Sequence, residues 1–442
     1  MNQTKRQLGS VEYLHKYAHD NGSGSGIILT FVRITGHFNK EQIINALHKV
    51  CQRHPVLRAH LESKKCNYLK TEHSLYINQS INQLPVKFLV KTSDNQWKDI
   101  VENELQMQFA EHDFLWKIIV LLGKENEQCK HDFILKFHHV IMDGLSVAYF
   151  FRDFLNYYNN ENMLVNTLPF MPSVETLLKN QISWPKFLCR FIFYGLKCLW
   201  LKKYLYSFDS NATLSEIKTK SRYQCINENQ TSLLLAKCRE EKVTLTGLLN
   251  AALMIAVYRA YNNKNERQQI VTTPVSMRTL CDPPLGPEHL GCLISYVRTM
   301  HLLNYNSSLW ELARQYKKQL TKNISIYSHF PSKFSSRILD TLLALNNSGD
   351  LKTKFRYGLC ISNIGSVDFF SEVQGYSVDE VYSCTSHALG EVLMTIIVAS
   401  INNKIYLTFT HAEPLLHEKT AILIQKNLNS ILNDAVGIKI AE

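Results

Sequence analysis

Two adjacent histidines, His138 and His139, stand where an apolar run ends and an amphipathic run begins. An imidazole titrates at about 6.5 when unperturbed, so a loop histidine can accept and return a proton near neutral pH. Loops between strands and helices are where α/β proteins commonly present reactive groups. The segment 137–144, with the pattern HHxxxDG at its centre, is therefore the first candidate for an active site, and His139 is its candidate general base.

The other residues of this segment have structural and chemical interpretations. Asp143 could orient the loop or fix the imidazole tautomer, and Gly144 allows a backbone conformation or close approach that a side chain would forbid. Two structural histidines bonded to the backbone are the alternative interpretation of the pair. We expect no metal site, because neighbouring residues on a strand point to opposite faces and rarely bind one ion. The whole pattern is far more specific than either histidine alone.

Strand and helix signals alternate in both halves of the chain, which indicates an α/β protein. Apolar or β-branched runs predict strands at 27–34, 86–90, 117–122, 132–137, 269–274, 293–300, 357–361, 391–401 and 404–410. Helical periodicity, with Asn39 as an N-cap, predicts helices at 40–52, 145–158, 244–261, 308–321, 333–346 and 417–431. We expect an N-terminal subdomain over 1–172, a helical crossover over 173–215 and a C-terminal subdomain over 216–442.

Composition narrows the class of protein. The chain has 442 residues, and its 45% hydrophobic content can supply large cores. Eleven cysteines occur without any CxxC pair, which argues against a disulfide framework or structural zinc site and favours a reducing, cytoplasmic compartment. The basic start is not followed by the apolar run of a secretory signal. We expect a monomer.

The charge of +11 could serve nucleic acid, an anionic membrane or an anionic substrate. No nucleic-acid-binding motif accompanies it, so a nucleic-acid partner is not expected. No uncharged apolar run of about 18 residues predicts a membrane span. Residues 184–208 combine aromatic and basic side chains, and they form either buried crossover helices or a surface for peripheral membrane contact.

HHxxxDG resembles the signature of the chloramphenicol-acetyltransferase-like superfamily, which includes alcohol acetyltransferases, polyketide-associated acyltransferases and condensation domains. Three further strings carry the resemblance along the chain: RHPVLR at 53–58, PVSMR at 274–278 and SNIG at 362–365. They occur in the family's order and cover the whole chain. The late DFGWG string of the plant branch is absent, which argues against that branch.

The resemblance implies two subdomains, each a mixed sheet flanked by helices, which form a pseudodimer with a tunnel at their interface. It implies that His139 is the catalytic base, that His138 is structural, and that Asp143 pairs with Arg278 as a brace. Ser362 or Asn363 is a candidate oxyanion or acceptor contact, with a turn as the equal alternative for that string.

The implied partners are an acyl-thioester donor and a small-molecule or lipid alcohol or amine. The implied reaction moves an acyl group from the thioester to a hydroxyl acceptor in a ternary complex, since no GxSxG nucleophile motif is present. No cofactor is expected to be bound permanently; the co-substrate is an acyl-coenzyme A or a phosphopantetheine thioester on an acyl-carrier protein. We favour coenzyme A, because no synthetase domain is fused to the chain. The alternatives are a free-standing condensation enzyme that forms an amide, or a non-catalytic relative that docks a carrier protein.

Overall fold

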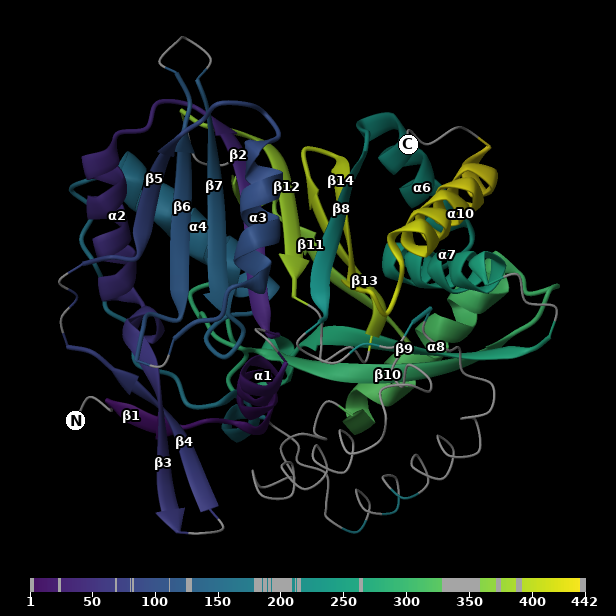
Figure 1. The fold of residues 1–442 in the computed structure, drawn as a ribbon, viewed down its shortest axis with the longest axis horizontal. Helices are drawn as coiled ribbons and strands as arrows, with labels where there is room; N and C mark the ends of the chain where they lie inside the picture. The colour runs from purple at the N-terminus through teal and green to yellow at the C-terminus, as the bar shows by residue number, and fades with distance from the viewer. Residues whose placement is uncertain are drawn as a thin grey trace.

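The computed structural model shows two α/β halves that lie side by side (Figure 1). Each half contains a mixed sheet flanked by helices, which confirms the predicted class. The residues that it describes are 4–22, 25–67, 70–79, 81, 83–110, 112–124, 129–178, 185, 189, 192, 209–210, 212, 216–261, 265–327, 358–370, 375–386 and 392–437.

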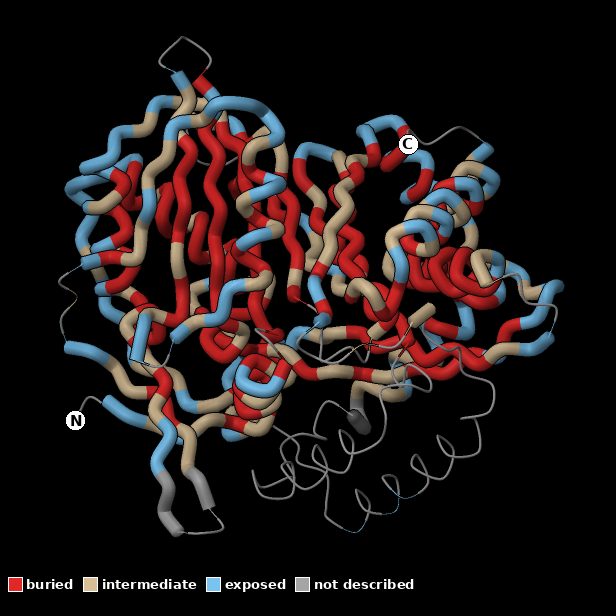
Figure 2. Tube along the Cα trace, viewed as in Figure 1, coloured by how far each residue is buried: buried red, intermediate tan, exposed pale blue. Residues whose placement is uncertain are grey.

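The sheet of the N-terminal half has five strands in the order β12-β2-β7-β6-β5. Its strands are β2 (Ile27–Thr35), β5 (Val86–Val90), β6 (Trp116–Leu122), β7 (Lys130–His138) and β12 (Ser377–Thr385). Only β5 and β6 pair in parallel. The central strands are buried along most of their length (Figure 2). Such strands read as nearly continuous apolar runs, which is why the sequence located them.

Helices cover both faces of this sheet (Figure 1). They are α2 (Lys40–Arg53), α3 (Gln96–Gln106) and α4 (Gly144–Asn159). Side chains alternate between the two faces of a strand. Phe31 points to α3, where it stacks on Trp97 at 3.9 Å, while Val32 faces α4. Asn39 caps α2 as predicted, because its side chain accepts hydrogen bonds from two N–H groups of the first turn.

A small sheet and a helix complete the N-terminal half. Its strands, in the order β1-β4-β3, are β1 (Lys5–Gln7), β3 (Ala59–Asn67) and β4 (Lys70–Ile77). The helix α1 (Ser10–Asn21) lies near the seam between the halves (Figure 1). One turn of 3₁₀ helix, Pro55–Arg58, connects α2 to β3.

The C-terminal half has a six-stranded sheet in the order β10-β9-β11-β13-β14-β8. Its strands are β8 (Lys218–Ile226), β9 (Arg267–Ser276), β10 (Ile294–Leu303), β11 (Gly358–Ser366), β13 (Val392–Ile401) and β14 (Lys404–Glu413). Its helices are α6 (Glu228–Glu240), α7 (Leu245–Ala260), α8 (Leu309–Tyr327) and α10 (Glu418–Val436). Helix α7 is buried on nearly all sides, as its uniform apolarity predicted.

Several elements were absent from the sequence-based prediction: α1, α3, α6, β1, β3, β4, β8 and β12. The predicted helix at 333–346 lies outside the described residues, as do nearly all of residues 184–208 and most of the predicted crossover at 173–215. Within the described part of the crossover, Val174–Leu177 forms one turn of 3₁₀ helix. Among the described residues, no single helix is long and apolar enough to cross a membrane; the bent pair α6 and α7, which meet at 96°, reaches that threshold together.

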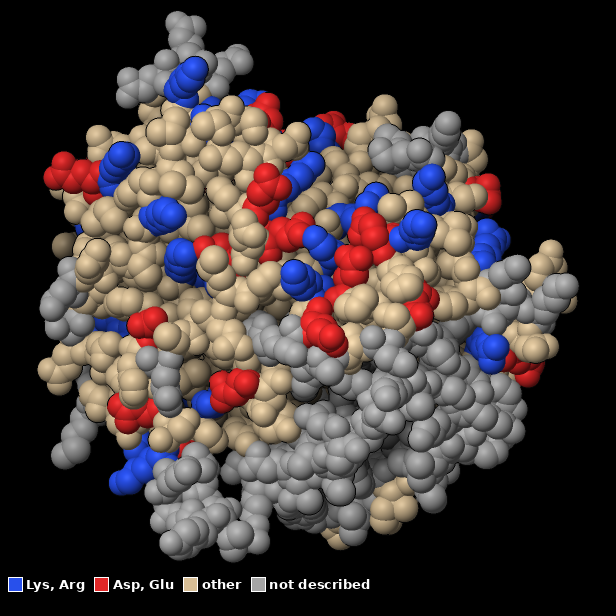
Figure 3. Space-filling view, in the orientation of Figure 1, with Lys and Arg blue, Asp and Glu red and all other residues tan. Residues whose placement is uncertain are grey.

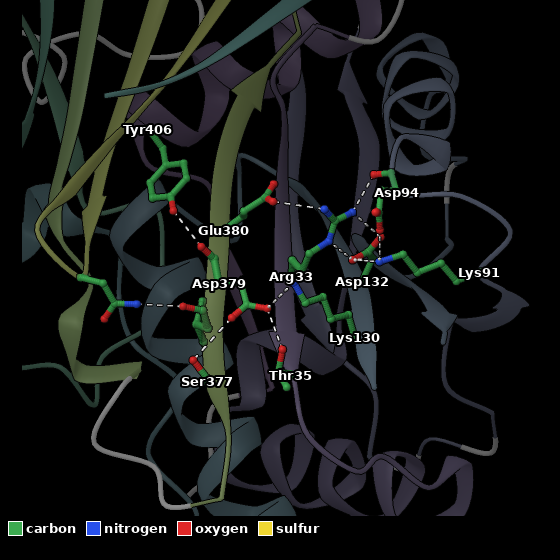
Figure 4. Close-up of polar contacts among 12 residues, drawn as sticks. Arg33, Thr35, Lys91, Asp94, Lys130, Asp132, Ser377, Asp379, Glu380 and Tyr406 are labelled. Atoms are coloured by element: carbon green, nitrogen blue, oxygen red, sulfur yellow. Dashed lines mark hydrogen bonds and ion pairs between the residues drawn. The ribbon is translucent and has the colours of Figure 1, made fainter. Parts of the chain in front are cut away.

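Strand β12 joins the two halves, because it lies beyond residue 216 in the chain but pairs with β2 of the first sheet. Buried charges accompany this pairing (Figure 4). Arg33 donates to the fully buried carboxylate of Asp132 at 2.8 and 3.0 Å, and to Glu380 of β12 at 3.1 Å. On the same strand pair, Thr35 donates to Asp379 at 2.7 Å. Sheet membership therefore does not follow the expected chain division at 216.

Tyr406 connects β14 of the second sheet to β12 of the first, because its hydroxyl donates to the carbonyl oxygen of Asp379 on β12 at 2.7 Å (Figure 4). Substitution of Tyr406 tests whether this contact stabilises the junction. We expect Tyr406→Phe to lower the free energy of unfolding by about 1 kcal/mol, since it leaves a carbonyl without its donor. Urea denaturation measures this loss. Tyr305→Phe is the control, because Tyr305 is 85% exposed. Equal midpoints for the two variants would show that the bond does not stabilise the junction.

Candidate active site

The HHxxxDG segment occupies the loop between β7 and α4. Strand β7 ends at His138, and Asp143 is the N-cap of α4, its carboxylate accepting from the N–H of Ser146 at 2.7 Å. The loop between them is fixed by its backbone: the N–H of His139 donates to the carbonyl oxygen of Gly26 at 2.8 Å. Backbone bonds to other segments therefore place both histidines without using their rings.

His138 is 1% exposed, and its ring packs among other rings. Its Nδ1 accepts a hydrogen bond from the N–H of Val140 at 3.1 Å. His19 and Phe109 lie beside it, with ring centroids 4.5 and 6.0 Å away. Burial, followed by the nearby His19, holds the pKa of His138 well below its ordinary value, so the ring is neutral. These contacts give His138 a packing role.

His139 as a residue is half-buried, but its Nδ1 atom is enclosed and one face of its ring is covered. That face stacks on the ring of His15, with centroids 3.9 Å apart and planes inclined by 11°. Burial of the ring lowers the pKa of His139 to about 4. The charge of Asp143 and backbone groups of His139 and Met142 act in the opposite direction without cancelling it. The imidazole is therefore neutral at pH 7 and can accept a proton.

Asp143 and Arg278 are brought together across the two halves. The Nη1 atom of Arg278 donates to Oδ2 of Asp143 at 2.9 Å, and Nη2 donates to Oδ1 at 3.2 Å. The same Nη2 donates to the hydroxyl of Ser146 at 2.7 Å, and the N–H of Leu293 donates to Asp143 at 3.0 Å. Burial alone would raise the pKa of Asp143, but the guanidinium of Arg278 and the hydrogen bonds from Ser146 together outweigh it and lower that pKa. The carboxylate remains charged and braces the junction.

Gly144 allows a close contact between α4 and β11. A Cβ atom on Gly144 would stand 3.2 Å from two side-chain carbons of Ile364, so Ile364 would have to shift. The SNIG string, which contains Ile364, thus reaches the first turn of the helix that follows the two histidines.

Within SNIG, the polar groups of Asn363 take part in local contacts. Its side-chain oxygen accepts from the N–H of Gly365 at 2.9 Å, and its Nδ2 donates to the hydroxyl of Thr246 at 2.9 Å. This contact lies within strand β11, where the pairing with β13 shifts between Asn363 and Gly365. Ser362 lies on β11, opposite Ile397 of β13. The structure thus brings Asn363 to the start of α7.

Comparisons with known proteins agree with this geometry. Residues 13–181 match the family model of the condensation domain, and residues 217–391 match that of the phthiocerol/phthiodiolone dimycocerosyl transferase C-terminus. The chain belongs to the condensation-domain and chloramphenicol-acetyltransferase-like superfamily of acyltransferases. A probable alcohol acetyltransferase, FCK4 of Fusarium pseudograminearum (strain CS3096), is 24% identical over 279 residues. That match covers 55% of this chain and 54% of the relative, so it spans about half of the relative's length.

Solved structures show the same fold. TRI3 trichothecene 15-O-acetyltransferase from Fusarium sporotrichioides superposes with a TM-score of 0.79 at 10% identity, over 98% of this chain and 96% of its own. Polyketide synthase associated protein 5 from Mycobacterium tuberculosis gives 0.66 at 14% identity, over 97% and 98%. These structural similarities confirm that the chain has the two-subdomain fold of condensation domains.

The structure also places residues at this site that the sequence did not indicate. His15 of α1 and Cys292 join His139, so that one donor atom from each lies within 4.8 Å of the others. Glu12, His15 and His19 recur at helical spacing on one buried face, and that polar stripe was the signal available. One metal ion could not lie in the planes of two stacked, nearly parallel rings at bonding distance from both.

Proposed function

We propose that the chain transfers an acyl group from a thioester to a hydroxyl acceptor, with His139 as general base. The observation that carries this proposal is a half-buried imidazole in the loop between β7 and α4, whose Asp143 pairs with Arg278 of the other half. The acceptor oxygen bonds to the thioester carbonyl carbon while His139 takes its proton. Collapse of the tetrahedral intermediate then breaks the carbon–sulfur bond, and His139 returns the proton to the departing thiolate.

A ternary complex fits the site better than a covalent acyl-enzyme. Among the described residues, Cys292 is the thiol that lies in one group with His139 and His15. Burial, with nearby carboxylates, raises the pKa of Cys292 well above its ordinary value, so it stays a thiol. A buried neutral thiol is a poor nucleophile, because the thiolate is the reacting form. Acyl transfer therefore goes directly from donor to acceptor.

For the acceptor we favour a hydroxyl group. Two similar proteins support this choice, a probable alcohol acetyltransferase and a trichothecene 15-O-acetyltransferase. Amide formation from carrier-protein thioesters is the second candidate, supported by the condensation-domain match over residues 13–181. Ser362 remains a proposed contact for the oxyanion or the acceptor.

For the donor we favour acyl-coenzyme A, whose phosphates suit the charge of +11. A carrier protein would need a broad basic surface. On the face shown in Figure 3, the described Lys and Arg side chains are interspersed with Asp and Glu along the seam. A monomer in the cytoplasm completes the proposal, with residues 184–208 as either buried crossover helices or a surface for peripheral membrane contact. The nine described cysteines are all free, which suits a reducing compartment.

A donor screen by mass spectrometry tests the reaction. Purified protein receives a panel of alcohols with either acyl-coenzyme A or acyl-carrier protein, and His139→Ala serves as the matched blank. We expect the wild type, but not His139→Ala, to form an ester from acyl-coenzyme A. Transfer only from the carrier protein would overturn the donor choice. Transfer from neither would favour a non-catalytic relative.

The pH dependence of kcat/KM follows from the lowered pKa of His139. Below its pKa the ring is protonated and cannot act as a base, so activity is lost as the pH falls through about 4. We expect a level profile from pH 7 to pH 5. An unperturbed imidazole would be only about 3% neutral at pH 5 and would lose about thirtyfold. A fall centred near 6.5, with unchanged tryptophan fluorescence as the control for folding, would contradict the buried-base assignment.

A further inference from the structure

The ring of His15 covers one face of the proposed base. His15 lies in α1, is 8% exposed, and stacks on His139 with the ring centroids 3.9 Å apart and the planes 11° from parallel. Two rings in contact over their faces restrict each other's rotation about the side-chain bonds. The stacked face of His139 is closed to water and substrate, so a substrate can approach only from another side.

His15 is in turn held from the other half of the chain. Its Nε2 lies 3.0 Å from the hydroxyl of Tyr296, which belongs to β10. Burial raises the pKa of Tyr296 well above its ordinary value, so this hydroxyl keeps its proton. It can donate to Nε2 of His15 or accept from it, according to the tautomer of the ring. A residue of the second sheet thus holds the ring of His15 in one orientation.

We propose that His15 is a positioning residue for His139, and that Tyr296 holds His15, so that the orientation of the base depends on contact between the two halves. The contact is independent of the brace between Asp143 and Arg278, which acts on the loop backbone and α4. Two separate contacts thus act on His139. The ion pair between Asp143 and Arg278 holds the backbone of its loop, and the stack with His15 holds the orientation of its ring.

The stack also controls how much water reaches His139. The titratable groups around it are His15 and Tyr296, the adjacent His138, Asp143 of the same loop, and Cys292. Burial holds the pKa of His15 well below its ordinary value, so no second imidazolium forms beside the base. Removing this ring would open one face of His139 to solvent. The pKa of His139 would then rise from about 4 toward its ordinary value.

Four variants test this inference. His15→Ala removes the stack, His15→Phe keeps an aromatic face without the hydrogen bond, and Tyr296→Phe removes only the hydroxyl that bonds to His15. Tyr316→Phe is the matched control, because the Tyr316 hydroxyl makes a buried 2.8 Å bond to Thr273 elsewhere in the second half. Two kinds of measurement are made on each full-length protein: the titration of the His139 ring by NMR, and the kinetic constants kcat and KM with acyl-coenzyme A.

We expect His15→Ala to raise the NMR titration point of His139, to move the acid limb of activity in the same direction, and to lower kcat about tenfold with KM little changed. His15→Phe should keep the low titration point, and Tyr296→Phe should lower kcat about threefold. Tyr316→Phe should leave both quantities as in the wild type. If His15→Ala does not fold, the two other variants carry the test.

The activity readout rests on the proposed function, whereas the NMR readout does not. A wild type without acyl transfer, combined with a shifted His139 titration in His15→Ala or Tyr296→Phe, would refute the proposed function and support the positioning. An unchanged titration and unchanged kcat in all three site variants would overturn the positioning, even with the transferase activity established.

Discussion

His139→Ala is expected to lower kcat/KM for acyl transfer by about 10²–10⁴-fold, the usual contribution of a general base. The reason lies in the geometry: the ring is neutral, reaches the surface in part, and its backbone is fixed by the bond to Gly26. Because that backbone bond does not involve the ring, the variant should keep its fold and a melting temperature close to that of the wild type. Thioester-dependent ester formation and circular dichroism measure the two effects.

His48→Ala is the matched control, because His48 is an exposed histidine on α2. It should retain full activity under the same assay. Turnover by His139→Ala within a few fold of the wild type would refute the assigned role. His138→Ala should behave differently from both, since it removes a fully buried ring and therefore lowers stability.

Breaking the pair between Asp143 and Arg278 is expected to have the largest effect on stability. Removal of either partner leaves a buried charge without its counter-ion, which costs about 3–5 kcal/mol. Asp143→Ala also removes the N-cap of α4, and Arg278→Ala also removes the donor to Ser146. Both single variants should therefore lose stability and activity together, because each releases the loop that carries His139.

A double-mutant cycle identifies the brace. If the two residues act as one unit, Asp143→Ala with Arg278→Ala should be little worse than the more damaging single change, as measured by chemical denaturation. Arg222 and Glu418, a half-exposed pair between β8 and α10, provide the comparison cycle, with an expected coupling of about 0–1 kcal/mol. Strictly additive losses at Asp143 and Arg278 would show that the ion pair does not support the junction.

The sequence by itself determined the class of fold, most of the long buried strands and the place of the site. The run before His138 is apolar at nearly every position, and the run after Asp143 has helical periodicity, so local patterning alone placed the motif between β7 and α4. The pairing of Asp143 with Arg278 was expected from the family resemblance, and the structure shows the contact. The donor, the acceptor and the roles of the site residues remain predictions.

The elements that the sequence did not reveal lack such patterning. Strands β3 and β4 form a hairpin rich in charged residues, and α1 buries Glu12, His15 and His19 where an apolar stripe would be expected. Polar groups become tolerable at buried positions when they find partners, as Glu12 does with Arg6 at 2.6 Å. Those partners come from other segments of the chain, so the local sequence does not predict them.

Only the tertiary structure decided which distant residues meet. β12 joins the first sheet although it follows β11 of the second, and its pairing with β2 places Glu380 against Arg33. His15 lies 124 positions before His139 (139 − 15) and still stacks on it, with Tyr296 holding it from the opposite half. Periodicity in the sequence indicates which face of a helix or strand is buried, but not which other element packs against that face. The contacts of the loop that carries His139 are therefore set by how the two halves pack.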